Sequence, residues 1–188
     1  MSPAPTLDAA DAELLTLDAA DDLFYARGVA DVTMSEIRDR SGVSLRRLYG
    51  MYPSKADLVA GWLRHRHTRW MDGFRARLSD ALERGVDPVD AIFDALASWM
   101  RATDWRGCGF INTHAERHDL TEEHARIIRD HKATLADDLG ALVASGRAIA
   151  VIVDGAIVQA SIFGNAEPIE LARTAAHAVA RSAQEEPT

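Results

Sequence analysis

Apolar residues recur at helical spacing along almost the whole of this 188-residue chain. Leu17, Ala20 and Phe24, for example, place one apolar stripe along a helix predicted over residues 8–27. No stretch of convincing length alternates apolar and polar residues as a half-buried strand does, and we find no repeat or low-complexity tract. The pattern therefore predicts an all-α protein.

Start and stop signals divide the chain into short and long helices. Thr33, with Glu36 three residues later, has capping-box spacing and predicts a helix over 33–40. Ser44 is placed to cap a brief helix over 44–49, which we expect Gly50 and Pro53 to end. Longer helices are predicted over residues 54–84, from 88 to a break at 105–109, from 121 to an end at Gly146, and over 148–163 and 168–181.

The charge of the chain is unevenly distributed. The net charge is −8, but residues 38–70 hold eight Arg and Lys side chains against two Asp, a net +6 that leaves −14 elsewhere. A basic patch on an acidic body can hold a phosphate backbone locally. Alternatively, Arg64, Arg66 and Arg69 form only the solvated face of a helix.

Cysteine usage and hydropathy favour a cytoplasmic protein. Cys108 is the only cysteine, so no intrachain disulfide can form, and a reducing compartment is expected. The N-terminus does not have the basic and apolar regions of a secretory signal. The most apolar stretch, residues 148–164, is interrupted by Asp154, Gln159 and Ser161, and we expect it to be too short to span a bilayer.

Two short helices joined by a glycine-containing turn are typical of a helix-turn-helix. Here the supporting helix is 33–40, the turn is 41–43 and the recognition helix is 44–49. We expect Val43 and Leu48 to face inward, towards apolar residues of the neighbouring helices. Residues 45–47 (Leu45, Arg46 and Arg47) then face a DNA groove, where the planar fork of arginine can bond a guanine edge or a phosphate.

Residues 17–58 resemble the DNA-binding head of the TetR family of transcriptional repressors. The resemblance is carried by residue types and spacings over about a quarter of the chain: Ala20 and Phe24, Gly28, Thr33, Ile37, Gly42-Val43-Ser44, Leu48-Tyr49, and Tyr52-Pro53-Ser54-Lys55 before Leu58. It implies that Thr33, Ser44, Tyr49 and Lys55 contact phosphates and that the positions of Leu45, Arg46 and Arg47 meet base edges.

The resemblance also implies two domains, a DNA-binding domain over 8–53 and a helical ligand-binding and dimerisation domain over 54–183. Residues 106–116 and 153–160 are similar to segments of one branch of these regulators. Such a protein is a cytoplasmic homodimeric repressor, with no enzymatic activity or cofactor, that binds a palindromic operator and is released by a small-molecule inducer. The last two helices would form the dimer interface; alternatively, they close the body's own core.

Pocket and metal sites are weaker hypotheses. The candidate walls of a ligand pocket are apolar, with His114 or His118 as a polar anchor. His114 and His118 are four residues apart, near Glu116 and Cys108, and would support a metal site or an enzyme as the alternative function. If the protein does not bind DNA, Arg46 and Arg47 would instead bind an acidic partner in a protein-interaction module. Cys108 is either a redox-sensing thiol or a small buried residue. The pocket candidates are Phe93, Trp99, Met100, Phe110, Asn112, His114 and Ile157.

Overall fold

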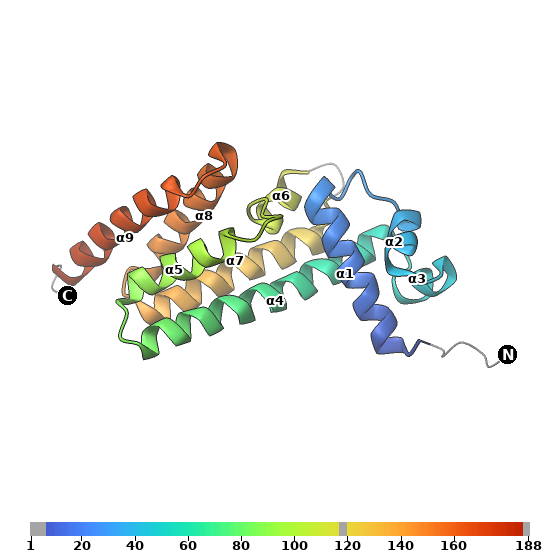
Figure 1. Ribbon diagram of the computed structural model, residues 1–188, viewed down its shortest axis with the longest axis horizontal. Helices are drawn as coiled ribbons and strands as arrows, with labels where there is room; N and C mark the ends of the chain where they lie inside the picture. The colour runs from blue at the N-terminus through green and yellow to red at the C-terminus, as the bar shows by residue number, and fades with distance from the viewer. Residues whose placement is uncertain (1–6, 117–119, 186–188) are drawn as a thin grey trace. The chain divides into compact units, whose positions relative to one another are not determined.

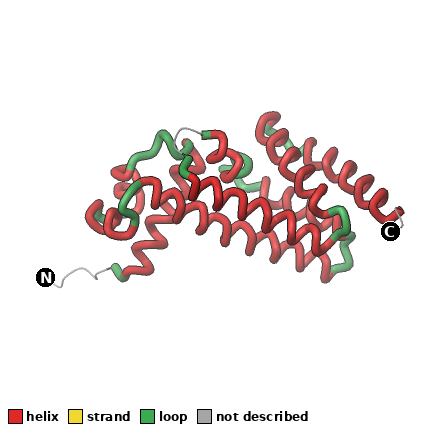
Figure 2. The backbone as a smooth tube through the Cα atoms, turned by 180° about the vertical axis from the view of Figure 1, so that it is seen from behind, coloured by secondary structure: helices red, strands yellow, loops and turns green. Residues whose placement is uncertain are grey.

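The computed structural model describes residues 7–116 and 120–185, and these form nine helices and no strand (Figures 1 and 2). The prediction of an all-α fold is confirmed. In chain order the helices are α1 (Ala9–Arg27), α2 (Met34–Ser41), α3 (Leu45–Met51), α4 (Lys55–Glu83), α5 (Pro88–Met100), α6 (Gly109–Ala115), α7 (Glu122–Leu142), α8 (Gly146–Phe163) and α9 (Glu167–Glu185).

Most predicted helix bounds lie within two residues of those observed, but α5 ends earlier, at Met100, and α9 ends later, at Glu185. Two further differences involve glycine. Gly50 lies inside α3 and does not end it. Gly146 begins α8 instead of ending α7, which stops at Leu142. A Cβ atom on Gly146 would lie 1.9 Å from the carbonyl oxygen of Leu139, so this glycine permits a close approach of two helices. Helix α6 was not predicted at all.

The chain divides into two compact units. The first unit comprises Met1–Arg66 and Phe110–Ile128, and the second comprises His67–Gly109 and Arg129–Thr188. Helices α4 and α7 therefore contribute residues to both units. The predicted functional domains, 8–53 and 54–183, are divided at a different position, and that functional division stays a prediction.

The core of the first unit joins α1, α2, α3 and the start of α4. The rings of Phe24 and Trp62 meet edge to face, with centroids 5.2 Å apart. The Trp62 indole N–H donates to Asp21 Oδ1 at 2.7 Å, and Arg66 donates to the same oxygen at 2.5 Å. This carboxylate therefore fastens α1 to α4 beside the buried side chains Ala20, Phe24, Ile37, Leu48, Leu58 and Trp62.

In the second unit, α9 packs against α8 and α5. Arg173 of α9 reaches α5, where its guanidinium donates to Asp90 at 3.2 Å and Asp94 at 2.8 Å. Its Cζ atom also lies 5.8 Å from the centroid of the buried Phe93 ring. These contacts fix the C-terminal helix on the body of the unit.

Helix α8 is buried on one side only. Val151, Ile162 and Phe163 of α8 are 65–73% exposed in the single chain, as is Leu171 of α9 at 65%. The expectation that this segment is too short to span a bilayer is wrong. The 18 residues of α8 are long and apolar enough to cross a membrane, judged by length and composition alone. Its opposite side, which includes Ile149, Val153 and Ile157, is buried in the fold.

Candidate nucleic-acid interface

The supporting helix α2 begins with a complete capping box. The Thr33 hydroxyl accepts the Glu36 backbone N–H at 3.3 Å, and the Glu36 carboxylate accepts the Thr33 N–H at 2.8 Å. Arg27 also donates to Glu36 at 2.7 Å. The hydrogen bonds from Arg27 and then Thr33 lower the pKa of Glu36 to about 2. Glu36 is therefore ionised at neutral pH and fixes Thr33 where the chain enters α2.

The turn between α2 and α3 depends on Gly42. Its backbone has φ +71° and ψ 3°, a left-handed conformation that costs little only for glycine. The Gly42 N–H donates to the Arg38 carbonyl at 2.8 Å, which ends α2. Val43 and Leu48 are buried as predicted, and Ile37 lies with them in the core. The turn therefore sets α3 against α2 with one face buried.

Helix α3 presents its other face to solvent. Ser44 caps the helix by accepting the Arg47 N–H at 3.4 Å. Arg46 is exposed, and no hydrogen bond or ion pair engages its side chain in the part of the chain described. Tyr49 is 48% exposed, and its hydroxyl likewise has no partner among the described residues. Leu45 is half-buried beside them.

Arg47, the neighbour of Arg46, is engaged within the protein. Its guanidinium donates to the carbonyl oxygen of Leu7 at 2.7 Å and also to that of Asp8, the residue that caps α1. Arg47 thus fastens the recognition helix to the start of α1, and the two adjacent arginines have different environments.

Lys55 is linked to the loop between α1 and α2. Its ammonium donates to the Ala30 carbonyl at 3.2 Å, while the Ala30 N–H donates to the Glu116 carboxylate at 2.9 Å. A Cβ atom on Gly28 would lie 3.0 Å from the same carboxylate, so Glu116 lies close against this loop. No local sequence pattern connects Glu116 with Lys55, because 61 positions separate them and only the fold brings both side chains to Ala30.

The basic window, residues 38–70, has fewer unpaired cations than its composition indicates, because acidic side chains pair with several of its arginines. Arg40 pairs with Asp22 at 2.5 Å, and Arg38 pairs with Asp39 at 2.7 Å. Of the three arginines on α4, Arg64 pairs with Glu123 and Arg66 with Asp21. Neither Arg64 nor Arg66 is the simple solvated side chain of the alternative interpretation. Among the described residues, the exposed cation of the candidate interface that forms no ion pair is Arg46 on α3.

Comparison with known proteins agrees with this geometry. The family model for the bacterial regulatory proteins of the tetR family matches residues 17–61, which span α2, the turn and α3. The structure of SCO4454, a TetR-family transcriptional regulator from Streptomyces coelicolor, is 26% identical, with a TM-score of 0.76 over 94% of this chain and 97% of that one. The chain belongs to the TetR family of transcriptional regulators. Its α2–turn–α3 is the DNA-binding helix-turn-helix.

Other TetR-family structures share the fold of this regulator. A TetR transcriptional regulator from Chloroflexus aurantiacus has a TM-score of 0.73 at 21% identity and covers 94% of this chain and 96% of its own. The reduced form of Escherichia coli NemR has a TM-score of 0.69 at 21% identity and covers 87% and 94%. The comparison with curated protein sequences found no match.

The predicted pocket residues of this TetR-family regulator fall in different places. Phe93 and Ile157 are buried in the second unit, whereas Trp99 and Met100 are only partly buried there. The other three, Phe110, Asn112 and His114, belong to the first unit, where Phe110 is buried and the two polar side chains are exposed. The pocket set stays a prediction.

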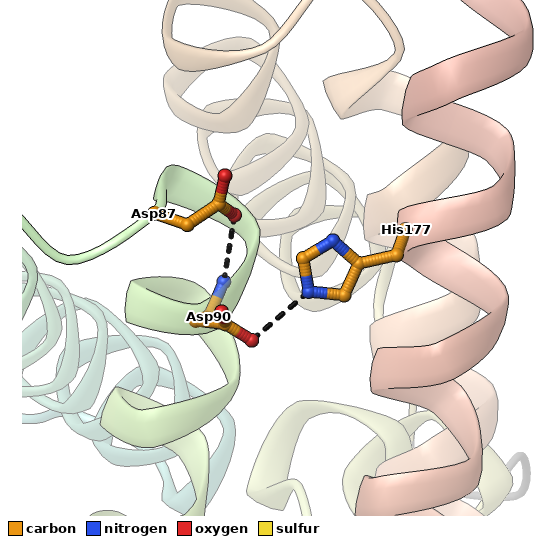
Figure 3. Close-up of side chains that lie close together, drawn as sticks. All are labelled: Asp87, Asp90 and His177. Atoms are coloured by element: carbon orange, nitrogen blue, oxygen red, sulfur yellow. Dashed lines mark hydrogen bonds and ion pairs between the residues drawn. The ribbon is translucent and has the colours of Figure 1, made fainter.

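The metal hypothesis does not gain a site in the described part of the regulator. His118 lies outside the described residues, and the Glu116 carboxylate is bonded to Ala30. The group of described residues close enough to share an ion is instead Asp87, Asp90 and His177 (Figure 3).

The carboxylates of that group already have protein partners. Asp87 caps α5, and Asp90 Oδ1 accepts from His177 Nε2 at 2.9 Å (Figure 3). Asp90 Oδ1 also accepts from Arg173 at 3.2 Å. The hydrogen bond from His177, followed by that from Arg173, lowers the pKa of Asp90. The group therefore serves to join α5 to α9.

Proposed function

We propose that this TetR-family regulator is a cytoplasmic repressor that binds a palindromic operator as a homodimer and is released by a small-molecule inducer. The observation that carries the proposal is the exposed face of α3. There the guanidinium of Arg46 and the hydroxyl of Tyr49 have no partner among residues 7–116 and 120–185, and they lie on a helix whose other side is buried through Leu48. Exposed donors of this kind suit base edges and phosphates.

We propose different roles for the two adjacent arginines. Arg46 is available to read a base, and Arg47 positions α3 through the carbonyls of Leu7 and Asp8. Thr33, Ser44, Tyr49 and Lys55 contribute donors to flanking phosphates, and Leu45 lies at the edge of the groove. The sequence placed both arginines at base edges.

The proposed dimer uses the apolar face of α8 and α9. Val151, Ile162, Phe163 and Leu171 are large apolar side chains exposed in the single chain, and an interface core of this composition stabilises homodimers. Two-fold symmetry then places two recognition helices for two half-sites about 34–36 Å apart, one turn of DNA. An inducer that binds better to an arrangement with a different spacing shifts the population away from DNA.

The proposal is tested by selecting binding sites from random duplex DNA with purified protein, first as isolated and again after unfolding and refolding to remove any bound inducer. We expect enrichment of an inverted repeat with half-sites about 10 base pairs apart, centre to centre. Arg46→Ala should relax preference at one position of each half-site, at a cost of about 1–3 kcal/mol per site. Failure of both preparations to enrich any sequence would contradict the proposal.

Two controls separate the roles within that experiment. Arg47→Ala should leave the base preference unchanged and lower stability, because Arg47 bonds the start of α1. If Arg47→Ala relaxes preference and Arg46→Ala does not, the assignment of the two arginines is reversed. The Phe163→Asp variant should be monomeric, as measured by analytical ultracentrifugation, and should no longer select an inverted repeat.

A further inference from the structure

The second unit contains an open cavity at the end of α5. It lies among the end of α5, the segment that follows it, the end of α8 and the turn between α8 and α9, and its volume is about 720 Å³. Met100 and Trp105 supply its large apolar surface, and Ser161 and Asn165 supply polar groups. This volume is in the range of small-molecule sites, which are about 300–1,000 Å³.

The ionisable groups that line this cavity carry one sign of charge. They are the guanidinium groups of Arg101 and Arg106, and no carboxylate lies among its described lining residues. Arg101 is exposed and has no ion pair in the part of the chain described, in contrast to Arg173 of the same unit, which three carboxylates surround. In a chain whose net charge is −8, a cavity lined by two arginines favours an anion.

A buried hydrogen-bond donor adds to this selectivity. The indole nitrogen of Trp105 is buried, and no acceptor bonds it in the described structure. Leaving a buried donor unpaired costs free energy, so such groups are usually satisfied by a ligand or water where the protein offers no acceptor. Trp105 also lines the cavity, and an oxygen of a bound ligand would supply that acceptor.

The walls of the cavity are held by close packing. Gly107 has φ +82°, and a Cβ atom on it would lie 3.2 Å from Ser161 Cβ, so the segment after Trp105 approaches α8 closely. Trp105 meets Trp99 edge to face at 5.6 Å, and Trp99 meets Trp70 of α4 at 5.7 Å. The apolar surface is thus largely formed before a ligand arrives, which lowers the ordering cost of binding.

We infer that this cavity binds an amphipathic organic anion, with its carboxylate or similar oxygens held by Arg101 and Trp105 Nε1 and its apolar part on Met100 and the indole ring. The inference rests on the proposed function in naming the chemical class of the inducer. The cavity differs from the pocket predicted from sequence, because of those residues it includes only Met100 in its lining.

The test is direct binding to the full-length protein in the absence of DNA, by isothermal titration calorimetry. The probes are decanoate and its neutral counterpart decanamide, which share an apolar chain. We expect saturable binding of decanoate with a Kd about tenfold lower than that of decanamide, the ratio typical of one charged hydrogen bond. Arg101→Ala should remove the preference for decanoate, and Trp105→Phe, which keeps an aromatic ring without the N–H, should raise the Kd several-fold.

Arg84→Ala is the matched control, because Arg84 is an exposed arginine of the same unit that lines a neighbouring groove and not this cavity. It should leave both Kd values unchanged, and circular dichroism should show native helicity for all three variants. No saturable binding of decanoate, equal affinity for the two probes, or a loss caused by Arg84→Ala and not by Arg101→Ala would each overturn the inference. Because the measurement involves no DNA, its outcome is independent of the site selection that tests the proposed function.

Discussion

The helix caps of the first unit and the ion pairs between helices of the second unit differ in sequence distance. In the first unit, the Thr33–Glu36 cap of α2 and the Ser54–Asp57 cap of α4 each join residues three positions apart. In the second unit, Lys132 reaches Asp154 across 22 positions at 2.6 Å, and Arg173 reaches Asp90 across 83. These helix starts are thus specified locally, whereas the packing of α9 on α5 and of α7 on α8 depends on residues far apart in the sequence.

Long-range contacts also occur in the first unit, and the removal of Asp21, which makes two of them, should have the largest effect. Asp21→Ala leaves the Trp62 N–H and the partly buried Arg66 without their shared acceptor, at a cost of about 3 kcal/mol. Urea denaturation would measure the loss. The control is Asp22→Ala, which removes an exposed pair with Arg40 and should cost less than about 1 kcal/mol. Equal losses of unfolding free energy for the two variants would show that the buried contacts of Asp21 stabilise the fold no more than the exposed Asp22–Arg40 pair does.

Gly42 and Gly164 allow the same change in each unit. Both end a helix in the left-handed conformation, with φ +71° and +67°, and neither would place a Cβ atom within 4 Å of another group. Alanine at either position should therefore cost about 1–2 kcal/mol through backbone strain alone. Of the two, Gly42→Ala alone should also weaken DNA binding, measured by fluorescence anisotropy, because it shifts α3. Equal DNA affinity for both variants would argue against that coupling.

Acidification should affect the cap of α2 through Glu36. Because the folded-state pKa of Glu36 is about 2, below its ordinary 4.5, its stabilisation is complete above pH 4.5 and is lost as the pH falls towards 2. Glu36→Gln should therefore lower the free energy of unfolding at pH 7. The variant should also lose less stability than the unsubstituted protein between pH 4.5 and pH 2, as followed by circular dichroism. Asp90→Asn is the counterpart in the second unit, where the pKa is also lowered. Parallel acid profiles for Glu36→Gln and the unsubstituted protein would contradict this role.

The smallest effect on stability is expected at Tyr49. Its hydroxyl has no partner in the described structure, so Tyr49→Phe should change stability by less than about 0.5 kcal/mol. If the hydroxyl contacts a phosphate, the variant should lose DNA affinity about fivefold on every sequence. Tyr52→Phe is the opposite control. It removes a 3.0 Å bond to Glu13 and should lower stability with little effect on DNA affinity.

The sequence predicted α2, the turn and α3 better than the contacts that surround them, for a physical reason. The caps, the turn glycine and the buried positions of α2 and α3 depend on neighbours within a few residues, and each was found in place. Helix α6 escaped prediction because seven residues give too few turns for a periodic signal. The contacts of Glu116 with Ala30 and of Arg47 with Leu7 escaped because no local pattern encodes them.

The basic window shows the same limit for electrostatics. Counting charges indicated eight cations, but the partners of Arg40, Arg64 and Arg66 come from other helices. Only folding decides which cations stay exposed, and that decision distinguishes Arg46 from Arg47. The composition of residues 38–70 thus indicated where the interface lies, and the ion pairs in the structure show that Arg46 is the exposed cation within it.

The placement of the four tryptophans has a spectroscopic consequence. Trp70, Trp99 and Trp105 contact one another in series in the second unit, with ring planes nearly perpendicular at 83–85°, whereas Trp62 donates to a carboxylate in the first. Neighbouring indoles at such distances exchange excitation, while Trp62 emits from a separate environment. Intrinsic fluorescence therefore contains two signals, and a Trp62→Phe variant would isolate the one that reports on the second unit without any added label.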